Sequence, residues 1–152
     1  YSGEGKGCTE NMQRLLRKME TAKTYLPKPV THEAKHDTPF GAIYFGSTSA
    51  AMEEAIAALG ANGTALDTLR LKAFPFADEV VEFIAAHEQI FLVEQNRDAQ
   101  MRTLIVNELG VDPSRFVSVL HYDGTPITAR FIAAEIEQRL KATMPAIRKV
   151  RS

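Results

Sequence analysis

The sequence has a single cysteine, Cys8, and no tryptophan among its 152 residues. One thiol cannot form an internal disulfide, which agrees with a reducing compartment. A large excess of either charge is absent as well, because 18 Lys and Arg residues stand against 19 Asp and Glu residues. The basic clusters are interrupted by acids and leave no electrostatic footprint for nucleic acid. We therefore expect no nucleic-acid partner.

Long hydrophobic runs are also missing. No apolar run approaches the ~20 residues that a membrane-spanning helix needs. The opening residues, YSGEGKGCTE, lack the charged start and apolar middle of a signal peptide. These absences predict a soluble, cytoplasmic protein with no membrane partner. The chain begins with Tyr1 rather than methionine, which favours a piece of a longer polypeptide over a processed chain.

Residues 41–63 form the unit around which the rest of the sequence is organised. The run 42–45 is apolar, β-branched and aromatic and ends at Gly46, which is typical of a central strand. The hydroxyl residues at 47–49 can each cap a helix. An apolar helical face follows, at Met52, Ala55, Ile56 and Leu59, and Gly60 ends the pattern. The unit is therefore a strand, a turn and a helix.

The rest of the chain repeats this unit. Further strands are expected at residues 65–74, 89–95 and 116–121. Further helices are expected at 77–87, at 99–109 and from Thr128 until Pro145 breaks the last one. In the helix at 77–87 the inward-facing side chains are expected to be Val80, Val81, Phe83 and Ile84. Short connections between alternating strands and helices predict an α/β fold, a three-layer α/β/α domain at residues 41–144 with a mostly parallel sheet.

Residues 1–40 are expected to form a linker before this domain. Glycines make residues 1–9 flexible, and prolines make residues 25–40 an extended, largely irregular arm. Between them, residues 10–23 have the period of an amphipathic helix, with an apolar face at Met12, Leu15, Leu16 and Met19. This helix packs either on the core of the domain or on a neighbouring domain, and the sequence leaves both open. Residues 145–152 are expected to form a loose basic tail.

The arm contains a literal match to the zinc-binding pattern H-E-x-x-H, at residues 32–36. That chemistry needs both histidines on one face of a stable helix and a third ligand elsewhere. Pro29 and Pro39 leave room for about two helical turns, and no apolar face would bury them. We interpret the match as a coincidence in a solvated arm and expect no metal site in the chain.

The loops that follow the strands hold the candidate functional residues. The carboxyl ends of parallel strands meet at one edge of the sheet, where such folds bind ligands and partners. After the first strand, Ser47 and Thr48 either offer a helix start to an anion or simply cap the helix. After the third strand, Glu94, Asn96 and Arg97 form a polar cluster. It either reaches an interface or a ligand, or hydrogen-bonds within its own loop.

The other two loops carry aromatic residues. Phe74, Phe76 and Tyr122 are typical of a docking surface rather than of a reaction centre. His121 and Asp123 have the chemistry for acid–base catalysis, but no serine or cysteine nucleophile in a suitable setting accompanies them. We therefore assign no catalytic residue.

Four motifs occur in an order that resembles a known family. They are IYFGSTSAAMEEAIAAL, LRLKAFPF, IFLVEQNRDAQMRTLI and VLHYDGTPIT, preceded by the basic helix ENMQRLLRKME. In this order they resemble the C-terminal domain of the alpha subunit of 2-oxoacid:ferredoxin (acceptor) oxidoreductases. The resemblance implies a transketolase C-terminal-like fold within a thiamine diphosphate enzyme. That enzyme would oxidatively decarboxylate a 2-oxoacid, with a slight preference for 2-oxoglutarate, to an acyl-coenzyme A and pass the electrons to ferredoxin.

The same resemblance implies a set of cofactors and partners. The whole enzyme would contain thiamine diphosphate, Mg and an iron–sulfur cluster. This chain would contact the remainder of the alpha subunit and a thiamine diphosphate-binding beta subunit, and ferredoxin would bind the assembled enzyme. The chain itself lacks the G-D-G and asparagine of a diphosphate site, and its one cysteine cannot ligate a four-iron cluster. We assign no cofactor-binding residue and expect the domain alone to be inactive.

The family's motif positions at the strand ends supply candidates for an interface or for the rim of an active site. They are Ser47, Thr48, Glu94, Asn96, Tyr122, Asp123 and Gly124. His121 stands where we expect lysine more often, which weakens any charge-dependent role at that loop. Two other functions stay open: a freestanding α/β ligand-binding or interaction module, and the equivalent domain of another thiamine enzyme, such as a transketolase or a 2-oxoacid dehydrogenase E1 component.

Overall fold

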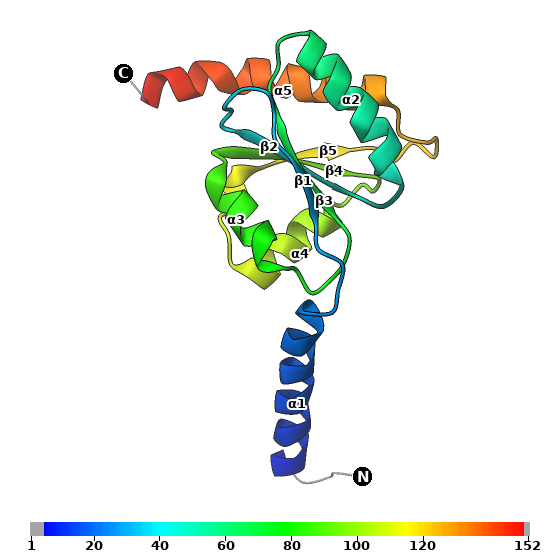
Figure 1. Cartoon of the computed structure of the whole chain (residues 1–152), viewed down its shortest axis with the longest axis vertical. Coiled ribbons are helices and arrows are strands. Elements are labelled where there is room, and N and C mark those ends of the chain that lie inside the picture. The colour runs from blue at the N-terminus through cyan, green and yellow to red at the C-terminus, as the bar shows by residue number, and fades with distance from the viewer. Residues whose placement is uncertain (1–4, 151–152) are drawn as a thin grey trace.

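The protein is built on a five-stranded sheet with the strand order β1-β3-β2-β4-β5 (Figure 1). The computed structural model describes residues 5–150. The parallel strands are β2 (Phe40–Phe45), β3 (Asp67–Leu71), β4 (Gln89–Glu94) and β5 (Phe116–Leu120). At the edge, β1 (Val30–His32) pairs antiparallel with β3. In the centre, Ile43 pairs with Leu69 on one side and with Leu92 on the other, so apolar side chains meet along the sheet.

Helices cover both faces of this sheet, and the expected three-layer α/β/α fold is confirmed (Figure 1). On one face lie α2 (Ser49–Ala61) and α5 (Ala129–Val150), which pack against each other. On the other face lie α3 (Asp78–Ala86) and α4 (Gln100–Leu109). Two short 3₁₀ helices, Gly46–Thr48 and Pro113–Arg115, sit in the connections.

The alternating direction of strand side chains produces two separate cores. Tyr44 and Phe91 face α2 and α5 and pack with Met52, Leu59 and Ile132. The intervening strand residues face the other way, where they form the second core with α3 and α4. Because the central strands are buried on both faces, their sequences are apolar at nearly every position.

The amino-terminal edge of the sheet is tied to α3 by a buried histidine. His87 contacts the Phe83 carbonyl through Nδ1 at 2.7 Å and the Asp67 carboxylate through Nε2 at 3.0 Å. The other oxygen of Asp67 accepts a hydrogen bond from the Ala34 N–H at 2.7 Å. Gly41 on β2 faces the rings of Phe83 and His87, and a Cβ there would stand 2.8 Å from the Phe83 ring. This glycine is required because α3 packs so closely on β2.

Several expectations about the elements are wrong in detail. Val81 is 42% exposed, because α3 turns only Val80, Phe83 and Ile84 into the core. The last helix continues through Pro145 to Val150. A proline removes one backbone hydrogen bond, and the helix formers around it continue the helix. The expected loose tail is therefore helical as far as residue 150, and residues 151–152 lie outside the described range.

The amino-terminal segment is also more regular than expected. A helix, α1 (Gly5–Lys23), begins within the stretch expected to be flexible, of which residues 1–4 lie outside the described range. The proline-rich arm contributes β1 to the sheet, so it is not wholly irregular. His32 ends that strand and residues 33–36 are not helical, so the H-E-x-x-H match does not lie on a helix. The division of the chain at residues 40 and 144 stays a prediction.

The described residues contain no helix that is long and apolar enough to span a membrane. Within the same range, no group of three His, Cys, Asp or Glu side chains is placed to hold a metal ion.

Candidate strand-end site

The centre of the strand-end edge lies between β2 and β4. The chain passes from β2 to β3 on one side of it and reaches β4 on the other, so the connections after β2 and β4 diverge there. A hollow of about 450 Å³ opens at this point, between the turn at 45–48 and the start of α4. Its lining is Phe45, Gly46, Ser47, Thr48, Gln95, Asn96, Gln100, Met101 and Leu104.

Gln95 joins the two sides of this hollow. Its Nε2 donates to the Ser47 hydroxyl at 3.0 Å and to the Thr48 hydroxyl at 3.2 Å. Thr48 is buried, whereas Ser47 and Gln95 are exposed. Neither hydroxyl caps α2, because Thr48 makes no capping bond and the Ser49 hydroxyl instead donates to the Gly46 carbonyl at 2.7 Å. Ser47 and Thr48 are therefore positioned from the neighbouring strand rather than by their own helix.

Glu94 lies behind the hollow, where it is hydrogen-bonded to the lining residues Asn96 and Met101. Its side chain is completely buried, and its two oxygens accept hydrogen bonds from the Met101 N–H at 2.8 Å and the Arg102 N–H at 3.1 Å. These N–H groups belong to the first turn of α4 and have no partner within the helix. The carboxylate thus caps α4 and complements the positive end of the helix dipole. Glu94 has no surface to offer a partner directly.

Asn96 shapes the same loop. Its Nδ2 donates to Glu94 at 2.8 Å, and its Oδ1 accepts from the N–H groups of Asp98 at 3.1 Å and Gln100 at 3.3 Å. Arg97 points outward and pairs with Asp98 at 2.7 Å, with both side chains more than half exposed. Of the two interpretations of this cluster, hydrogen bonding within the loop accounts for Glu94 and Asn96. Asn96 is half-buried and still lines the hollow.

The loop after β5 forms a second, separate cluster. Asp123 Oδ1 accepts from the Thr125 N–H at 2.8 Å and from its hydroxyl at 2.7 Å. The N–H bond first, and then the hydroxyl, hold the pKa of the Asp123 carboxyl below its usual value. Gly124 has a φ of 86°, which this turn requires. Tyr122 is 64% exposed, and neither it nor its two neighbours lines the hollow between β2 and β4.

His121 is buried beside this turn. Its Nε2 lies 3.4 Å from Asp123 Oδ1, and its ring meets the Phe131 ring edge-on at 4.8 Å. A buried imidazole that packs on an aromatic ring, next to a carboxylate already used by the turn, is a structural arrangement. The Asp123 oxygen nearest the imidazole already accepts two hydrogen bonds from Thr125, which accounts for its position.

The aromatic residues after β3 divide between the core and the surface. Phe76 is buried in the core with α3, whereas Phe74 is 42% exposed, and the two rings meet edge-on at 5.3 Å. Phe74 and Tyr122 are thus the residues of the expected docking surface that remain accessible. They belong to different loops, on the two sides of the central hollow.

Sequence reasoning missed Gln95 as a positioning residue. The signal that could have found it is the alternation of a strand, because a buried Glu94 at the end of β4 sends the next side chain to the opposite side. The hydrogen bonds to Ser47 and Thr48 depend on the neighbouring position of β2, which no local pattern shows.

Comparison with known proteins finds similar folds among solved structures. No protein-family model matches the chain, and no curated protein matches it. Among solved structures, the chain is similar to 2-oxoglutarate:ferredoxin oxidoreductase from Magnetococcus marinus, solved with 2-oxoglutarate, coenzyme A and succinyl-CoA bound. The TM-score is 0.78 at 17% identity, over 90% of this chain and 24% of that one.

A second similar structure is the alpha chain of a probable 2-oxoacid ferredoxin oxidoreductase from Thermoplasma acidophilum. The TM-score is 0.51 at 26% identity, over 75% of this chain and 97% of that one. The expected fold is confirmed. A split-gene transketolase, an inactive β4 tetramer, shares it as well, with a TM-score of 0.59 at 18% identity over 75% of this chain and 41% of that one. The chain spans about a quarter, 24%, of the length of the M. marinus chain.

Proposed function

We propose that this chain is the non-catalytic C-terminal domain of the alpha subunit of a thiamine diphosphate-dependent 2-oxoacid:ferredoxin oxidoreductase. The observation that carries the proposal is the pair of oxidoreductase similarities. The same domain matches 97% of the T. acidophilum alpha chain and 24% of the much longer M. marinus chain. A unit found both as a nearly complete alpha chain and as part of a longer one suits a role in assembly rather than an independent activity.

The strand-end chemistry supports a role without catalysis. Glu94 and Asp123 are the carboxylates of the candidate set, and both already serve backbone N–H groups, one at the start of α4 and one in a turn. An iron–sulfur cluster does not fit this chain, because Cys8 is its single cysteine and is exposed on α1. Thiamine diphosphate, Mg and the cluster would therefore be held by other parts of the enzyme.

The candidates that line the hollow or stand exposed would form the contact with those parts. The central hollow is lined by Ser47, Thr48 and Asn96. The loop after β5 exposes Tyr122, Asp123 and Gly124. Together the two groups would make a rim of polar groups with one aromatic anchor. We propose that this rim faces the rest of the alpha subunit or the beta subunit. Glu94 would act from behind, by fixing the loop that carries Asn96. The reaction would convert a 2-oxoacid, for which we propose 2-oxoglutarate, to its acyl-coenzyme A with electrons passing to ferredoxin in the cytoplasm.

The test is to tag the native parent protein, purify it anaerobically and measure thiamine diphosphate, iron and co-purifying subunits together. We expect all three in fixed ratio, and 2-oxoglutarate-dependent reduction of ferredoxin that requires coenzyme A. A tagged protein that carries neither cofactor nor a second subunit would contradict the proposal. Activity with another 2-oxoacid in place of 2-oxoglutarate would change the substrate and leave the assignment of the domain intact.

A further inference from the structure

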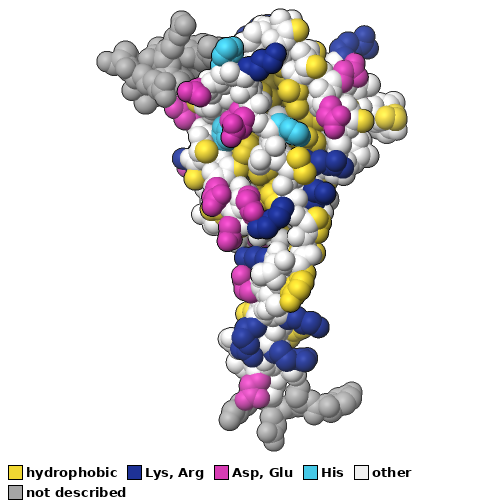
Figure 2. Space-filling view, in the orientation of Figure 1, with side chains coloured by type: hydrophobic (Ala, Val, Ile, Leu, Met, Phe, Trp, Pro, Cys, Tyr) yellow, Lys and Arg dark blue, Asp and Glu magenta, His cyan; other side chains and the backbone are white. Residues whose placement is uncertain are grey.

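The helix α1 carries an uncovered apolar stripe. Of the nine large hydrophobic side chains exposed among the described residues, four lie on this helix: Met12, Leu15, Leu16 and Met19. Figure 1 shows α1 projecting away from the α/β body, and Figure 2 shows hydrophobic side chains along one side of it with Lys and Arg beside them. An isolated helix of this length is marginal in water, and most helices are stabilised by packing of their apolar face. The stripe therefore calls for a covering partner.

The spacing of the stripe indicates what shape of partner fits. Cys8, Met12, Leu15, Met19 and Ala22 follow each other at alternating steps of four and three residues. This repeat of 3.5 residues is the a/d pattern by which one helix packs along another helix. Leu16 lies beside this line at an e position and widens the apolar face, as on a helix that packs against a globular core. The unbroken line of a and d positions is what favours a second helix as the partner of α1.

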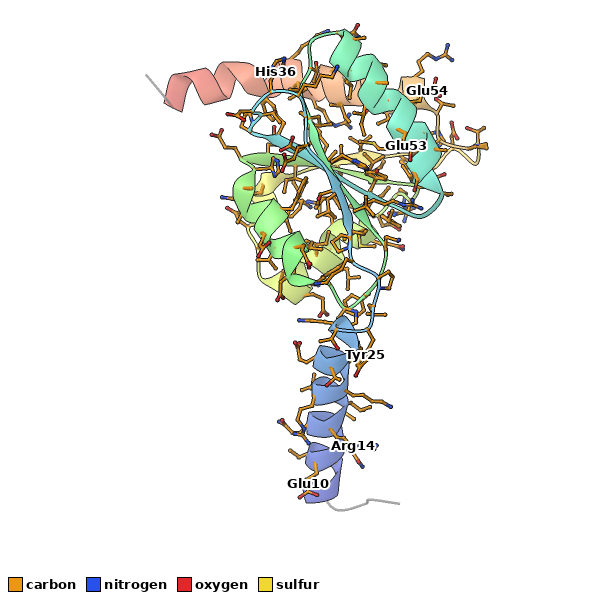
Figure 3. All side chains as sticks on the ribbon, in the orientation of Figure 1. Glu10, Arg14, Tyr25, His36, Glu53 and Glu54 are labelled. Atoms are coloured by element: carbon orange, nitrogen blue, oxygen red, sulfur yellow. The ribbon has the colours of Figure 1, made fainter. Side chains whose placement is uncertain are left out.

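The charges beside the stripe indicate the chemistry of that helix. Arg14 and Lys18 stand one turn apart along one flank, and no ion pair among the side chains that the structure describes involves either of them. On the other flank, Lys23 is paired with Glu20 at 3.0 Å. Figure 3 shows Arg14 on the part of α1 that lies away from the body. One flank is therefore an unsatisfied basic edge, which suits acidic side chains on the partner.

A second copy of α1 does not supply acidic side chains at the positions that would face this basic edge. In the heptad with Met12 at a and Leu15 at d, the e and g positions that flank the seam are Thr9, Leu16, Lys23, Asn11, Lys18 and Tyr25. None is acidic, so two copies give no favourable pair in an antiparallel arrangement. In a parallel arrangement they bring Lys18 next to Lys23. The charges thus favour a different partner over self-association.

The base of α1 offers a place where such a helix would end. A groove of about 720 Å³ separates the carboxyl-terminal half of α1 from the body, and its apolar lining includes Leu16, Met19, Phe74 and Leu109. The exposed Phe74 thus continues the apolar stripe onto the body. A helix lying along α1 would bury its end against this ring.

We propose that α1 binds an amphipathic helix with its own a/d apolar seam and with acidic side chains on the flank that faces Arg14 and Lys18. The inference stands on the surface of α1 and does not require the oxidoreductase assignment. Its failure would leave the cofactor test of the whole enzyme untouched.

The test uses the full 152-residue chain and two synthetic peptides. Both peptides have about four heptads with Leu at a and d, and they carry Glu or Lys, respectively, at every e and g position. Like charges keep each peptide from pairing with itself near neutral pH. Fluorescence anisotropy of the labelled peptide gives the Kd. We expect the Glu peptide to bind at least about tenfold more tightly than the Lys peptide.

Variants of the chain locate the contact. Leu15→Gln, outside both cores, should abolish Glu-peptide binding while circular dichroism of the body is kept. Lys18→Glu should weaken Glu-peptide binding by about two- to fivefold and strengthen Lys-peptide binding. Arg130→Glu is the matched control, since it makes the same charge change at an exposed position of α5 that lines no part of the groove, and it should leave both Kd values nearly unchanged.

Three results would overturn the proposal. Equal affinity for the two peptides would mean that the apolar stripe binds any amphipathic helix without regard to its charge. No binding of the Glu peptide would mean that α1 does not pair with a helix. Sedimentation that shows the chain dimerising, with loss of the dimer in the Leu15→Gln variant, would identify a second copy as the partner instead.

Discussion

Two amphipathic helices of this protein, α1 and α3, have opposite surroundings. Each carries a clear apolar face in the sequence, but α3 buries Phe83 and Ile84 against the sheet, whereas α1 leaves Leu15 and Leu16 exposed. The difference lies in the partner rather than in the helix. A periodic apolar face determines which side of a helix will be covered, and only the connections and the neighbouring strands decide by what.

Truncation of one apolar side chain in each helix would sharpen this contrast most. Phe83→Ala should lower the free energy of unfolding by about 3–5 kcal/mol, because it leaves a cavity in a filled core. Leu15→Ala on α1 should change it by less than about 0.5 kcal/mol, because Leu15 touches no core. Urea denaturation of both variants measures the difference. A large loss for Leu15→Ala would show that α1 packs on this domain after all.

The helix α4 lies on the same face of the sheet as α3, and Glu94 from the preceding strand caps its first turn. No such contact from another element caps the start of α1 among the described residues. Glu94→Gln should destabilise the protein by about 1–3 kcal/mol, because the amide replaces one acceptor oxygen with a donor that faces N–H groups. Asp98→Asn makes the same chemical change on an exposed side chain of that loop and should stay within about 0.5 kcal/mol. Similar denaturation midpoints for the two variants would contradict the assigned cap.

Close contact between α3 and the sheet predicts a strict requirement at Gly41. A Cβ there would lie 2.8 Å from Phe83 Cε1 and 3.1 Å from His87 Cγ, so Gly41→Ala should cost about 1–3 kcal/mol. Gly60 on α2 meets nothing within 4 Å, and Gly60→Ala should be neutral or stabilise by up to about 1 kcal/mol. Thermal denaturation followed by circular dichroism measures the change in stability of each variant. No change for Gly41→Ala would mean that α3 has room to move away from β2.

The exposed loop after β5 is expected to show the smallest effect. Hydrogen bonds from Thr125 lower the pKa of Asp123 in the folded state, so its contribution to stability is present above the unfolded value of about 3.9 and is lost as the pH falls through the folded value. Asp123→Asn should therefore lower the urea midpoint at pH 7, with a difference from the parent that shrinks below about pH 4. Glu54→Gln, on the exposed side of α2 (Figure 3), serves as the control with no such turn to lose. A difference for Asp123→Asn that does not depend on pH would contradict the electrostatic origin.

The alternation of elements was predictable because each has a local signal. The apolar run that ends at Gly46 predicted β2, and Gly110, with a φ of 62°, ended α4 where its pattern stopped. The errors fall where a local signal competes with its surroundings. Pro145 did not end α5, and the arm before Pro39 gained β1 because β3 offered a free edge. Val81 was assigned inward because consecutive apolar residues widen the apparent face.

The candidate site was predictable in its residues and not in their roles. Parallel strands place their following loops at one edge, so Ser47, Glu94 and Tyr122 were found from position alone. Their roles differ because each has different hydrogen-bond partners in the neighbouring elements. Glu94 turns inward to α4, Ser47 is held by Gln95, and Tyr122 remains free on another loop.

The sequence by itself determined the α/β class, the existence and nature of each main helix and central strand, and the apolar stripe of α1, because these depend on periodicity and on local turn residues. Only the tertiary structure decided the strand order, the burial of Glu94 and the lack of cover over α1. Each of these depends on which segments meet in space, and that is set by the packing of residues that lie far apart in the chain.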